Sequence, residues 1–339
     1  MLPRAADFAP FSPRFPWRGR DAQTLRNFLL GPRVTLEDRE GERLDFEMPD
    51  GTGDRLCGVL SKPTGLGGKR PLVVLTHGLS GCEESSYMLA SARFFLARGY
   101  PVLRLNLRGS VPTQPHCREY YHAGRDEDLA AVLRHIRHRE EAAAGIVPIG
   151  FSLGGNMLLK FLAGHGTDFP IPAAVSVSAP IDLAGAAERF LQPRNRFYHA
   201  WILRHMKRDA LAARDLDERV ARAIRGVRTI YEFDDRVVAP RNGFESAQDY
   251  YRRCSAAGYL AEISVPTLIV HALDDPWIPA AAYLDVAWRD MPNLTPLLPE
   301  LGGHVGFHDD EGTWHNRMAE RFIALINAPK AERSCNDAC

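Results

Sequence analysis

One short stretch, Gly150-Phe-Ser-Leu-Gly-Gly155, constrains the fold of this chain more than any other. An apolar run at 146–149 precedes it and is typical of a buried strand, whereas residues 156–163 have the pattern of an amphipathic helix. G-x-S-x-G between a strand and a helix predicts a tight, strained turn that exposes the Ser152 hydroxyl. Glycines at 150 and 154 relieve the collisions that larger side chains would make there. The helix start also directs backbone N–H groups toward negative charge that develops beside the serine.

Taken alone, this stretch leaves two interpretations of Ser152 open. A serine between a strand and a helix can be a nucleophile, or it can be an N-cap whose hydroxyl accepts a hydrogen bond from the first helical turn. A serine is a poor nucleophile at neutral pH unless a base and an acid lie nearby. The rest of the chain has to supply those groups.

Strand and helix patterns alternate along much of the chain. Continuous apolar runs, typical of strands buried on both faces, lie at 72–76, 101–105, 146–149, 173–178, 266–271 and 294–298. Amphipathic helical patterns lie between or after them at about 84–98, 125–139, 280–289 and 312–326. This alternation predicts an α/β fold with a mostly parallel, doubly wound sheet.

Two regions depart from the alternation. Residues 1–33 are rich in Pro and Arg and are expected to wrap the surface in extended form, and segments 34–38, 43–48 and 56–60 are expected to form an antiparallel hairpin with a third strand. Between 180 and 263 the pattern is helical and polar, with periodic segments at 189–206 and 211–225. We interpret this region as a helical cap that covers the carboxyl edge of the sheet, where such sheets bind ligands.

The predicted organisation has five parts. It comprises an N-terminal extension with antiparallel strands (1–70), the first part of the α/β core (71–180), the cap insertion (181–263), the second part of the core (264–329) and a disordered tail (330–339).

Composition excludes several classes of protein. Lys and Arg total 42, as do Asp and Glu, so no overall charge points to nucleic acid or to an anionic membrane. No apolar run approaches the roughly 18 residues of a membrane-spanning helix, and residues 1–19 lack the apolar segment of a signal peptide. The six cysteines have no spacing typical of a metal site or a disulfide framework. We expect a soluble cytoplasmic protein with reduced cysteines, whose oligomeric state the sequence does not indicate.

Candidate partners for Ser152 follow the last two predicted core strands. Asp274 and Asp275 come after the strand that ends at His271, and His304 comes after the final strand. Loops that follow parallel strands meet at one edge of the sheet and commonly carry function. The order serine, acid, histidine is the order expected of α/β-hydrolases.

The choice within each set of candidates rests on local context. We favour Asp275 because it directly precedes the Pro-Trp-Ile-Pro turn, whereas Asp274 is expected to solvate or cap that turn, and the choice stays open. Gly302 and Gly303 make room for a sharp loop before His304. Three other histidines are interpreted as non-catalytic: His271 as a satisfied core residue, and His308 and His315 as surface residues.

The loop after the first core strand supplies a candidate oxyanion hole. His77-Gly-Leu-Ser-Gly81 can present the backbone N–H of Leu79, and the N–H of Leu153 directly after the nucleophile is the second expected donor. His77 is expected to hold this loop in shape. Arg108 is interpreted as the partner of a buried acid rather than as a substrate contact.

With these residues assembled, the chain resembles the YheT-like (ABHD1/2/3-type) subfamily of α/β-hydrolase serine esterases. The resemblance covers nearly the whole chain, including the cap. It is carried by the segments Gln23-Thr-Leu25, His77-Gly-Leu-Ser-Gly81, Asn106-Leu-Arg-Gly109, Gly150-Phe-Ser-Leu-Gly-Gly-Asn156, Glu232-Phe-Asp-Asp235, Asp249-Tyr-Tyr251, Cys254-Ser255, Asp274-Asp-Pro276 and Gly302-Gly-His304.

The resemblance implies an α/β-hydrolase fold and hydrolysis of carboxylic esters. It implies Ser152 as nucleophile, Asp275 as acid and His304 as base, and activity on short-chain esters and acylglycerols. No metal or organic cofactor is expected. We expect an ester or acylglycerol substrate, without nucleic acid or a membrane span, and with Phe151, Trp277, Tyr198 and Trp201 as substrate-binding side chains.

Two rival functions remain open. An acylglycerol lipase is the nearer, because the cap segment 197–203 is apolar and could line an acyl pocket or touch a lipid surface, although we favour packing of this segment on the core. The other is a non-catalytic binding protein on a hydrolase scaffold, since a fold does not guarantee an activity.

Overall fold

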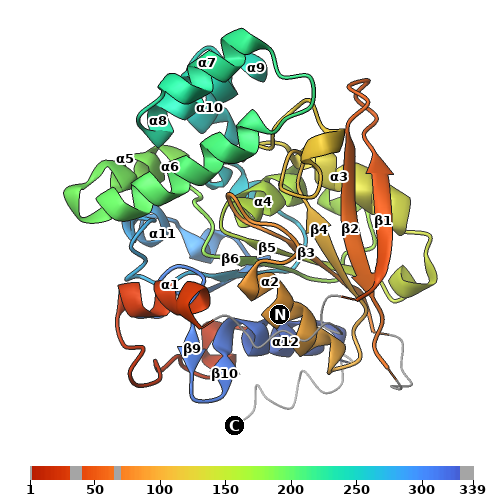
Figure 1. The fold of residues 1–339 in the computed structure, drawn as a ribbon. Coiled ribbons are helices and arrows are strands. Elements are labelled where there is room, and N and C mark those ends of the chain that lie inside the picture. The colour runs from red at the N-terminus through yellow and green to blue at the C-terminus, as the bar shows by residue number, and fades with distance from the viewer. Residues whose placement is uncertain (1, 31–39, 65–69, 329–339) are drawn as a thin grey trace.

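A mixed eight-stranded sheet organises the protein (Figure 1). The computed structural model describes residues 2–30, 40–64 and 70–328. The spatial order of the strands is β1-β2-β4-β3-β5-β6-β7-β8, with β2 antiparallel to β1 and to β4 and the remaining pairs parallel. The strands are β1 (Glu42–Glu47), β2 (Arg55–Ser61), β3 (Leu72–Thr76), β4 (Val102–Asn106), β5 (Ile146–Phe151), β6 (Ala174–Val177), β7 (Thr267–Val270) and β8 (Leu294–Leu297). The prediction of a mostly parallel sheet with an N-terminal antiparallel hairpin is confirmed.

Helices cover both faces of this sheet, as Figure 1 shows. Helices α2 and α12 pack on one face, and α3 and α4 pack on the other. Because side chains alternate along a strand, β3 serves both cores: Val73 and Leu75 join the cluster of α2 and α12, while Leu72 and Val74 join that of α3 and α4. The core helices are α2 (Ser86–Leu96), α3 (Asp126–Ile136), α4 (Leu153–His165) and α12 (Trp314–Asn327).

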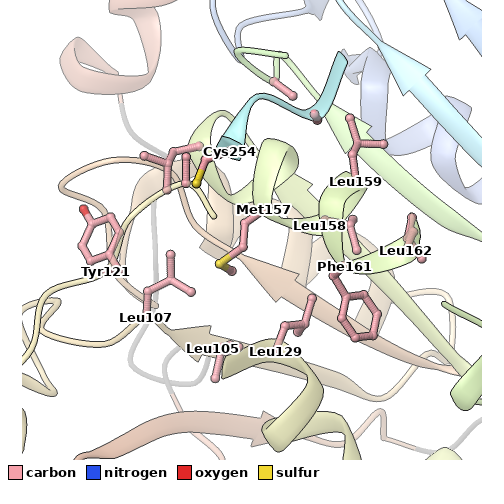
Figure 2. Packing of buried hydrophobic residues seen from close by; sticks show 14 of the residues in the cluster. Leu105, Leu107, Tyr121, Leu129, Met157, Leu158, Leu159, Phe161, Leu162 and Cys254 are labelled. Atoms are coloured by element: carbon pink, nitrogen blue, oxygen red, sulfur yellow. The ribbon is translucent and has the colours of Figure 1, made fainter. Parts of the chain in front are cut away.

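The larger core surrounds α4, the helix that begins directly after Ser152. Figure 2 shows Met157 of α4 among Leu105 and Leu129, with Cys254 from the cap close by. All of these side chains are buried. The position of α4 is therefore fixed by packing against the sheet, against α3 and against the cap.

The chain between β6 and β7 is helical, and Figure 1 shows these helices gathered beyond one edge of the sheet. They are α5 (Leu183–Leu191), α6 (Arg196–Leu211), α7 (Glu218–Gly226), α8 (Ile230–Phe233), the π-helical turn η7 (Asp234–Val238), α9 (Ala239–Arg241), α10 (Ala247–Cys254) and the 3-10 segment η8 (Ala256–Glu262). We refer to this region as the cap. The periodic segment expected at 189–206 is not one helix, because Pro193 separates α5 from α6 and the residue before a proline disfavours helical geometry.

Two further expectations about local structure need correction. Residues 20–29 form a helix, α1 (Arg20–Leu29), rather than an extended wrap. The helix expected at 280–289 is reduced to α11 (Ala281–Leu284) and a 3-10 turn, η9 (Trp288–Asp290). The antiparallel hairpin joins β1 to β2, and the strand expected at 34–38 and the tail lie outside the described residues.

Short elements complete the description. Near the termini lie the 3-10 turn η1 (Ala5–Asp7) and the two short strands β9 (His308–Asp309) and β10 (Gly312–Thr313). Further 3-10 turns lie within the chain: η3 (Gln114–His116), η4 (Glu140–Ala142), η5 (Gly166–Asp168) and η6 (Pro193–Asn195). Figure 1 shows α1 beside the hairpin of β9 and β10. This neighbourhood places the N-terminal helix against the loop that carries His304.

Candidate active site

Ser152 lies in a strained turn between β5 and α4. Its backbone has φ 52° and ψ −123°, a left-handed conformation that costs energy for a residue with a Cβ. The flanking glycines are required by space: a Cβ on Gly150 would lie 2.4 Å from the carbonyl oxygen of Gly154, and one on Gly154 would lie 2.4 Å from that of His77. The turn thus has the geometry that the G-x-S-x-G spacing predicts, with the serine held at the carboxyl edge of the sheet.

Three side chains from different loops meet at this turn. The Nε2 of His304 lies 2.9 Å from the Oγ of Ser152, and its Nδ1 lies 2.8 Å from Oδ2 of Asp275. Oδ1 of Asp275 accepts backbone hydrogen bonds from Trp277 and Ile278 at 2.8 and 3.1 Å. The arrangement forms a continuous hydrogen-bonded series from a buried carboxylate through an imidazole to a hydroxyl.

The electrostatics of Asp275 favour its ionised form. Burial raises the pKa of this carboxyl, but the adjacent His304 and the backbone donors outweigh burial, and the net pKa lies below its ordinary value. Asp274 has a different position: its Oδ1 accepts the N–H of Gly303 at 2.8 Å, which ties together the two post-strand loops. Of the two neighbouring acids, Asp275 is the one that contacts the imidazole.

Two backbone N–H groups beside Ser152 are free to bind an anion. The N–H of Gly78 donates to the hydroxyl of Tyr87 at 2.9 Å, and that of Ser80 donates to the hydroxyl of Tyr121. Among the described residues, no acceptor is bonded to the N–H of Leu79, which lies between them, or to that of Leu153 at the start of α4. Both residues line the same cavity as Ser152.

The ring of His77 fixes the conformation of the loop at 77–81. Its Nδ1 lies 2.7 Å from the carbonyl oxygen of Gly78, and its Nε2 accepts the N–H of Leu107 at 3.0 Å. Burial lowers the pKa of His77 to about 4, so the ring is neutral at physiological pH. The expectation that His77 shapes the loop agrees with these contacts.

A cavity of about 430 Å³ opens onto Ser152 and His304 and extends into the cap. Its cap side is mainly apolar, with Leu183, Ala187, Phe190, Ile202, Met206, Ile230 and Val238 among the lining residues. Trp201 and Trp277, two of the side chains predicted to bind substrate, also line it. A cavity of this size lies within the usual range for small-molecule sites.

Two expected substrate contacts are wrong. Phe151 is fully buried in the core on the opposite side, where its ring packs against Tyr87 and His315, because residues adjacent in a strand point to opposite faces. Tyr198 does not line the cavity either: its hydroxyl donates to Asp21 at 3.0 Å, and its ring packs on the edge of Trp277. Tyr198 thereby joins the cap to α1.

The other histidines also lie differently from expectation. His308 and His315 are buried rather than on the surface, and burial lowers the pKa of each to about 3. His271 lies in the core as expected, but its ring nitrogens have no hydrogen-bond partner among the described residues, and it stacks on Tyr283 at 3.8 Å instead. None of the three contacts Ser152.

Sequence reasoning missed the residues of α1 that support the histidine loop. The hydroxyl of Thr24 accepts the N–H of His304 at 2.9 Å, and the side-chain amide of Asn27 donates to the carbonyl of Val305 at 3.0 Å. Gln23 bonds both backbone groups of His308. A Cβ on Gly303 would lie 2.5 Å from the carbonyl oxygen of Arg20. This glycine is therefore the sequence feature that indicates the close approach of α1 to the histidine loop.

Arg108 is a structural residue, as interpreted from the sequence. Its guanidinium is almost fully buried and contacts the carboxylates of Asp54 and Asp128 at 3.0 and 2.5 Å. Burial opposes the charge of Arg108, yet the surrounding carboxylates raise its pKa above the ordinary value. The group ties β2, the loop after β4 and α3 together behind the site.

Neither a metal cluster nor a membrane span emerges from the described parts of the chain. Within residues 2–30, 40–64 and 70–328, no three His, Cys, Asp or Glu side chains are grouped to hold a metal ion. Over the same ranges, no helix combines the length and apolar character needed to cross a membrane.

Comparison with known proteins agrees with this geometry. A family model described as the alpha/beta hydrolase fold matches residues 71–311. The chain is 36% identical over 272 residues to "Putative esterase YheT" of Escherichia coli K12, a match that covers 77% of each protein. It is 27% identical over 331 residues to "Phospholipase ABHD3" of Homo sapiens, which covers 91% of this chain and 77% of that protein.

Solved structures repeat the same architecture at lower identity. The esterase Pf2001 of Pyrococcus furiosus superposes with a TM-score of 0.57 and 18% sequence identity, over 87% of this chain and 96% of that one. At this identity the likeness concerns the fold alone. The family match and the sequence identity together show that the chain belongs to the α/β-hydrolase family, in its YheT-like, ABHD3-type group of esterases and lipases.

Proposed function

We propose that the protein is a serine esterase that cleaves carboxylic esters through an acyl-enzyme intermediate. The observation that carries this proposal is the hydrogen-bonded series of Asp275, His304 and Ser152, with spacings of 2.8 and 2.9 Å, at the floor of a cavity. Ser152 Oγ attacks the ester carbonyl carbon while Nε2 of His304 takes its proton. Asp275 holds the imidazole in the required tautomer and stabilises the imidazolium.

The negative charge that forms on the carbonyl oxygen is bound by the backbone. The free N–H groups of Leu79 and Leu153 supply two donors at the start of α4, where the helix dipole also favours an anion. A donor of this kind contributes about 2.7–4 kcal/mol to the reaction barrier in comparable enzymes.

Collapse of the tetrahedral intermediate breaks the bond to the alcohol. His304 returns its proton to the departing alkoxide, so a neutral alcohol leaves and Ser152 remains acylated. A water molecule, deprotonated by the same imidazole, then attacks the acyl carbon and releases the acid. His304 is the side chain that carries the proton in each of these transfers.

The cavity supports short- to medium-chain acyl esters as substrates. Its volume of about 430 Å³ and its apolar cap lining suit an alkyl chain of modest length. Burial of each methylene contributes about 0.8 kcal/mol, so affinity should rise with chain length until the cavity is filled.

Hydrolysis of acylglycerols or phospholipids is a second candidate, favoured by the cap surface. Trp201 lines the cavity and is 43% exposed, and Phe197, earlier on α6, is 72% exposed. Large apolar side chains at the mouth of a cavity are typical of contact with a lipid surface. Turnover of monoacylglycerol against soluble esters of equal acyl length separates the two candidates.

Covalent labelling tests the shared mechanism. A fluorophosphonate probe is expected to label the protein at Ser152, and Ser152→Ala is expected to abolish both labelling and ester turnover. Ser86→Ala is the matched control because Ser86 lines the same cavity from α2, and this variant should still be labelled. Full ester turnover by Ser152→Ala would refute the proposal.

A further inference from the structure

The cap contains a buried carboxylate that has no basic partner among the described residues. Asp234 begins the π-helical turn η7 and is only 8% exposed. Within the described residues its side chain accepts one hydrogen bond, from the hydroxyl of Tyr251 to Oδ2 at 2.6 Å. A carboxylate has acceptor sites for about four hydrogen bonds, so most of those of Asp234 remain open.

This situation differs from that of every other buried carboxylate in the described ranges. Each of the others lies against a basic side chain: Asp54 and Asp128 against Arg108, Glu83 against Arg43, Asp126 against Lys160, Asp209 against Arg208, and Asp275 against His304. Burial of a carboxylate without such a partner is costly. Asp234 therefore lacks the compensation that the fold gives to all comparable groups.

Asp234 lies on the wall of the catalytic cavity. Both Asp234 and Tyr251 line it, together with Ser152 at its floor. The neighbouring wall from the cap is apolar, with Ile230 and Val238 on either side of Asp234 in the sequence. Single π-helical turns inside helices occur frequently at functional sites, and this one begins at a residue that lines the cavity.

We propose that Asp234, held by Tyr251, is a specificity subsite that binds a hydrogen-bond-donating group of the substrate, a hydroxyl or an ammonium, within the cap side of the cavity. The kinetic consequence of this subsite rests on the proposed ester hydrolysis at Ser152, whereas its binding consequence does not. Burial raises the pKa of the Asp234 carboxyl to about 7, and an approaching donor would favour its ionised form. The hydroxyl or ammonium of the substrate then takes the place of the basic side chain that the other buried carboxylates have.

Equilibrium binding tests the subsite without any turnover. The probes are octan-1-ol, which donates a hydrogen bond, octylamine, which donates as an ammonium, and 1-methoxyoctane, which only accepts. The full-length protein is expected to bind at least one of the two donors about tenfold or more tightly than the ether, as a hydrogen bond to a charged group implies. The ratio of Kd values is measured by isothermal titration, and the stronger donor identifies the chemistry.

Two cap variants assign this preference to its residue. Asp234→Asn keeps the shape and an acceptor for Tyr251 but presents an amide to the cavity, so the donor preference is expected to vanish. Asp235→Asn is the matched control, since the neighbouring carboxylate bonds the N–H of Ala247 at 3.0 Å and does not line the cavity. This control should keep the donor preference of the parent.

A kinetic comparison tests whether the subsite affects ester turnover. Nitrophenyl esters of ω-hydroxy and ω-amino acids are compared with plain acyl esters of equal length. Asp234→Asn should lower the ratio of kcat/KM for the preferred donor ester to that for the plain ester about tenfold. If Asp234→Asn does not fold, Tyr251→Phe serves instead. It removes the one donor that bonds the carboxylate among the described residues, so the donor preference should rise, and an unchanged or weaker preference would count against the subsite.

The outcomes separate the two proposals. Equal Kd values for both donors and the ether in the parent protein, or an unchanged preference in folded Asp234→Asn, overturn the subsite. If plain esters are still turned over in that case, the esterase proposal stands. If no ester is turned over but the donor preference in binding disappears with Asp234→Asn, the subsite stands and the esterase proposal fails.

Discussion

Asn156 offers the sharpest test of how the nucleophile is held beneath the cap. It lies on the first turn of α4 and is completely buried. Its amide donates to the carbonyl oxygens of Ala123 and Cys254 at 3.1 and 2.8 Å, and its oxygen accepts the N–H of Ala256 at 2.9 Å. One side chain thus joins the helix of Ser152 to a cavity loop and to the end of the cap.

Replacement of Asn156 by Ala removes all three bonds and leaves their backbone partners unpaired. A buried polar group without a partner costs about 1–3 kcal/mol, so three of them place the loss of unfolding free energy at about 3 kcal/mol or more. Water that enters the space left by the side chain would keep the loss near this lower value.

Urea unfolding of the parent and variant measures the difference, with stability extrapolated to zero denaturant. Asn293→Ala is the matched control, because Asn293 is only partly buried and donates one hydrogen bond, to the carbonyl of Ile263 at 3.2 Å. Its expected cost is about 1 kcal/mol. A loss below 1 kcal/mol for Asn156→Ala, or one equal to that of the control, would refute the reasoning.

Three further changes have defined outcomes. Asp275→Asn should lower kcat for ester hydrolysis on the order of 10³–10⁴-fold because it favours the wrong imidazole tautomer, whereas Asp274→Asn should lower it less than tenfold in the same assay. Arg108→Met removes the buried guanidinium that contacts two buried carboxylates and should cost about 3–5 kcal/mol in urea unfolding. The exposed Arg118→Met should cost less than about 1 kcal/mol, and equal losses would contradict the reasoning. The folded pKa of His315, about 3, lies below its unfolded value, so the contribution of this residue to stability is complete above about pH 6.5 and is lost as pH falls toward 3. His315→Gln should therefore reduce the pH dependence of the unfolding free energy in urea between pH 6 and 4 by up to about 1.4 kcal/mol per pH unit. An unchanged slope would count against this prediction.

Most of the sheet could be predicted from the sequence because its strands are continuous apolar runs. The strand at 72–76 has both faces buried, so its composition alone indicates its place. The strained turn at Ser152 could also be predicted from the sequence, because only glycine fits at 150 and 154. These features depend on a few neighbouring residues, and local sequence is sufficient for them.

Features that depend on distant contacts were harder to predict. The helix α1 lies in a segment rich in Pro and Arg, and the histidine loop that it contacts is more than 270 residues away in the chain. Phe151 adjoins Ser152 in sequence but points to the opposite face of the sheet. His308 and His315 are polar residues that distant segments bury: Gln23 of α1 bonds the backbone of His308, and the rings of Phe151 and Phe307 pack on His315.

The support of the histidine loop by α1 affects where the N-terminal boundary of the catalytic domain is placed. The family match begins at residue 71, so α1 (Arg20–Leu29) falls outside it. A protein shortened to the matched residues would retain Ser152, Asp275 and His304 but lose Thr24, which accepts the N–H of His304. A domain boundary placed at residue 71 from the family match would therefore separate the catalytic residues from α1, the helix that supports the histidine loop.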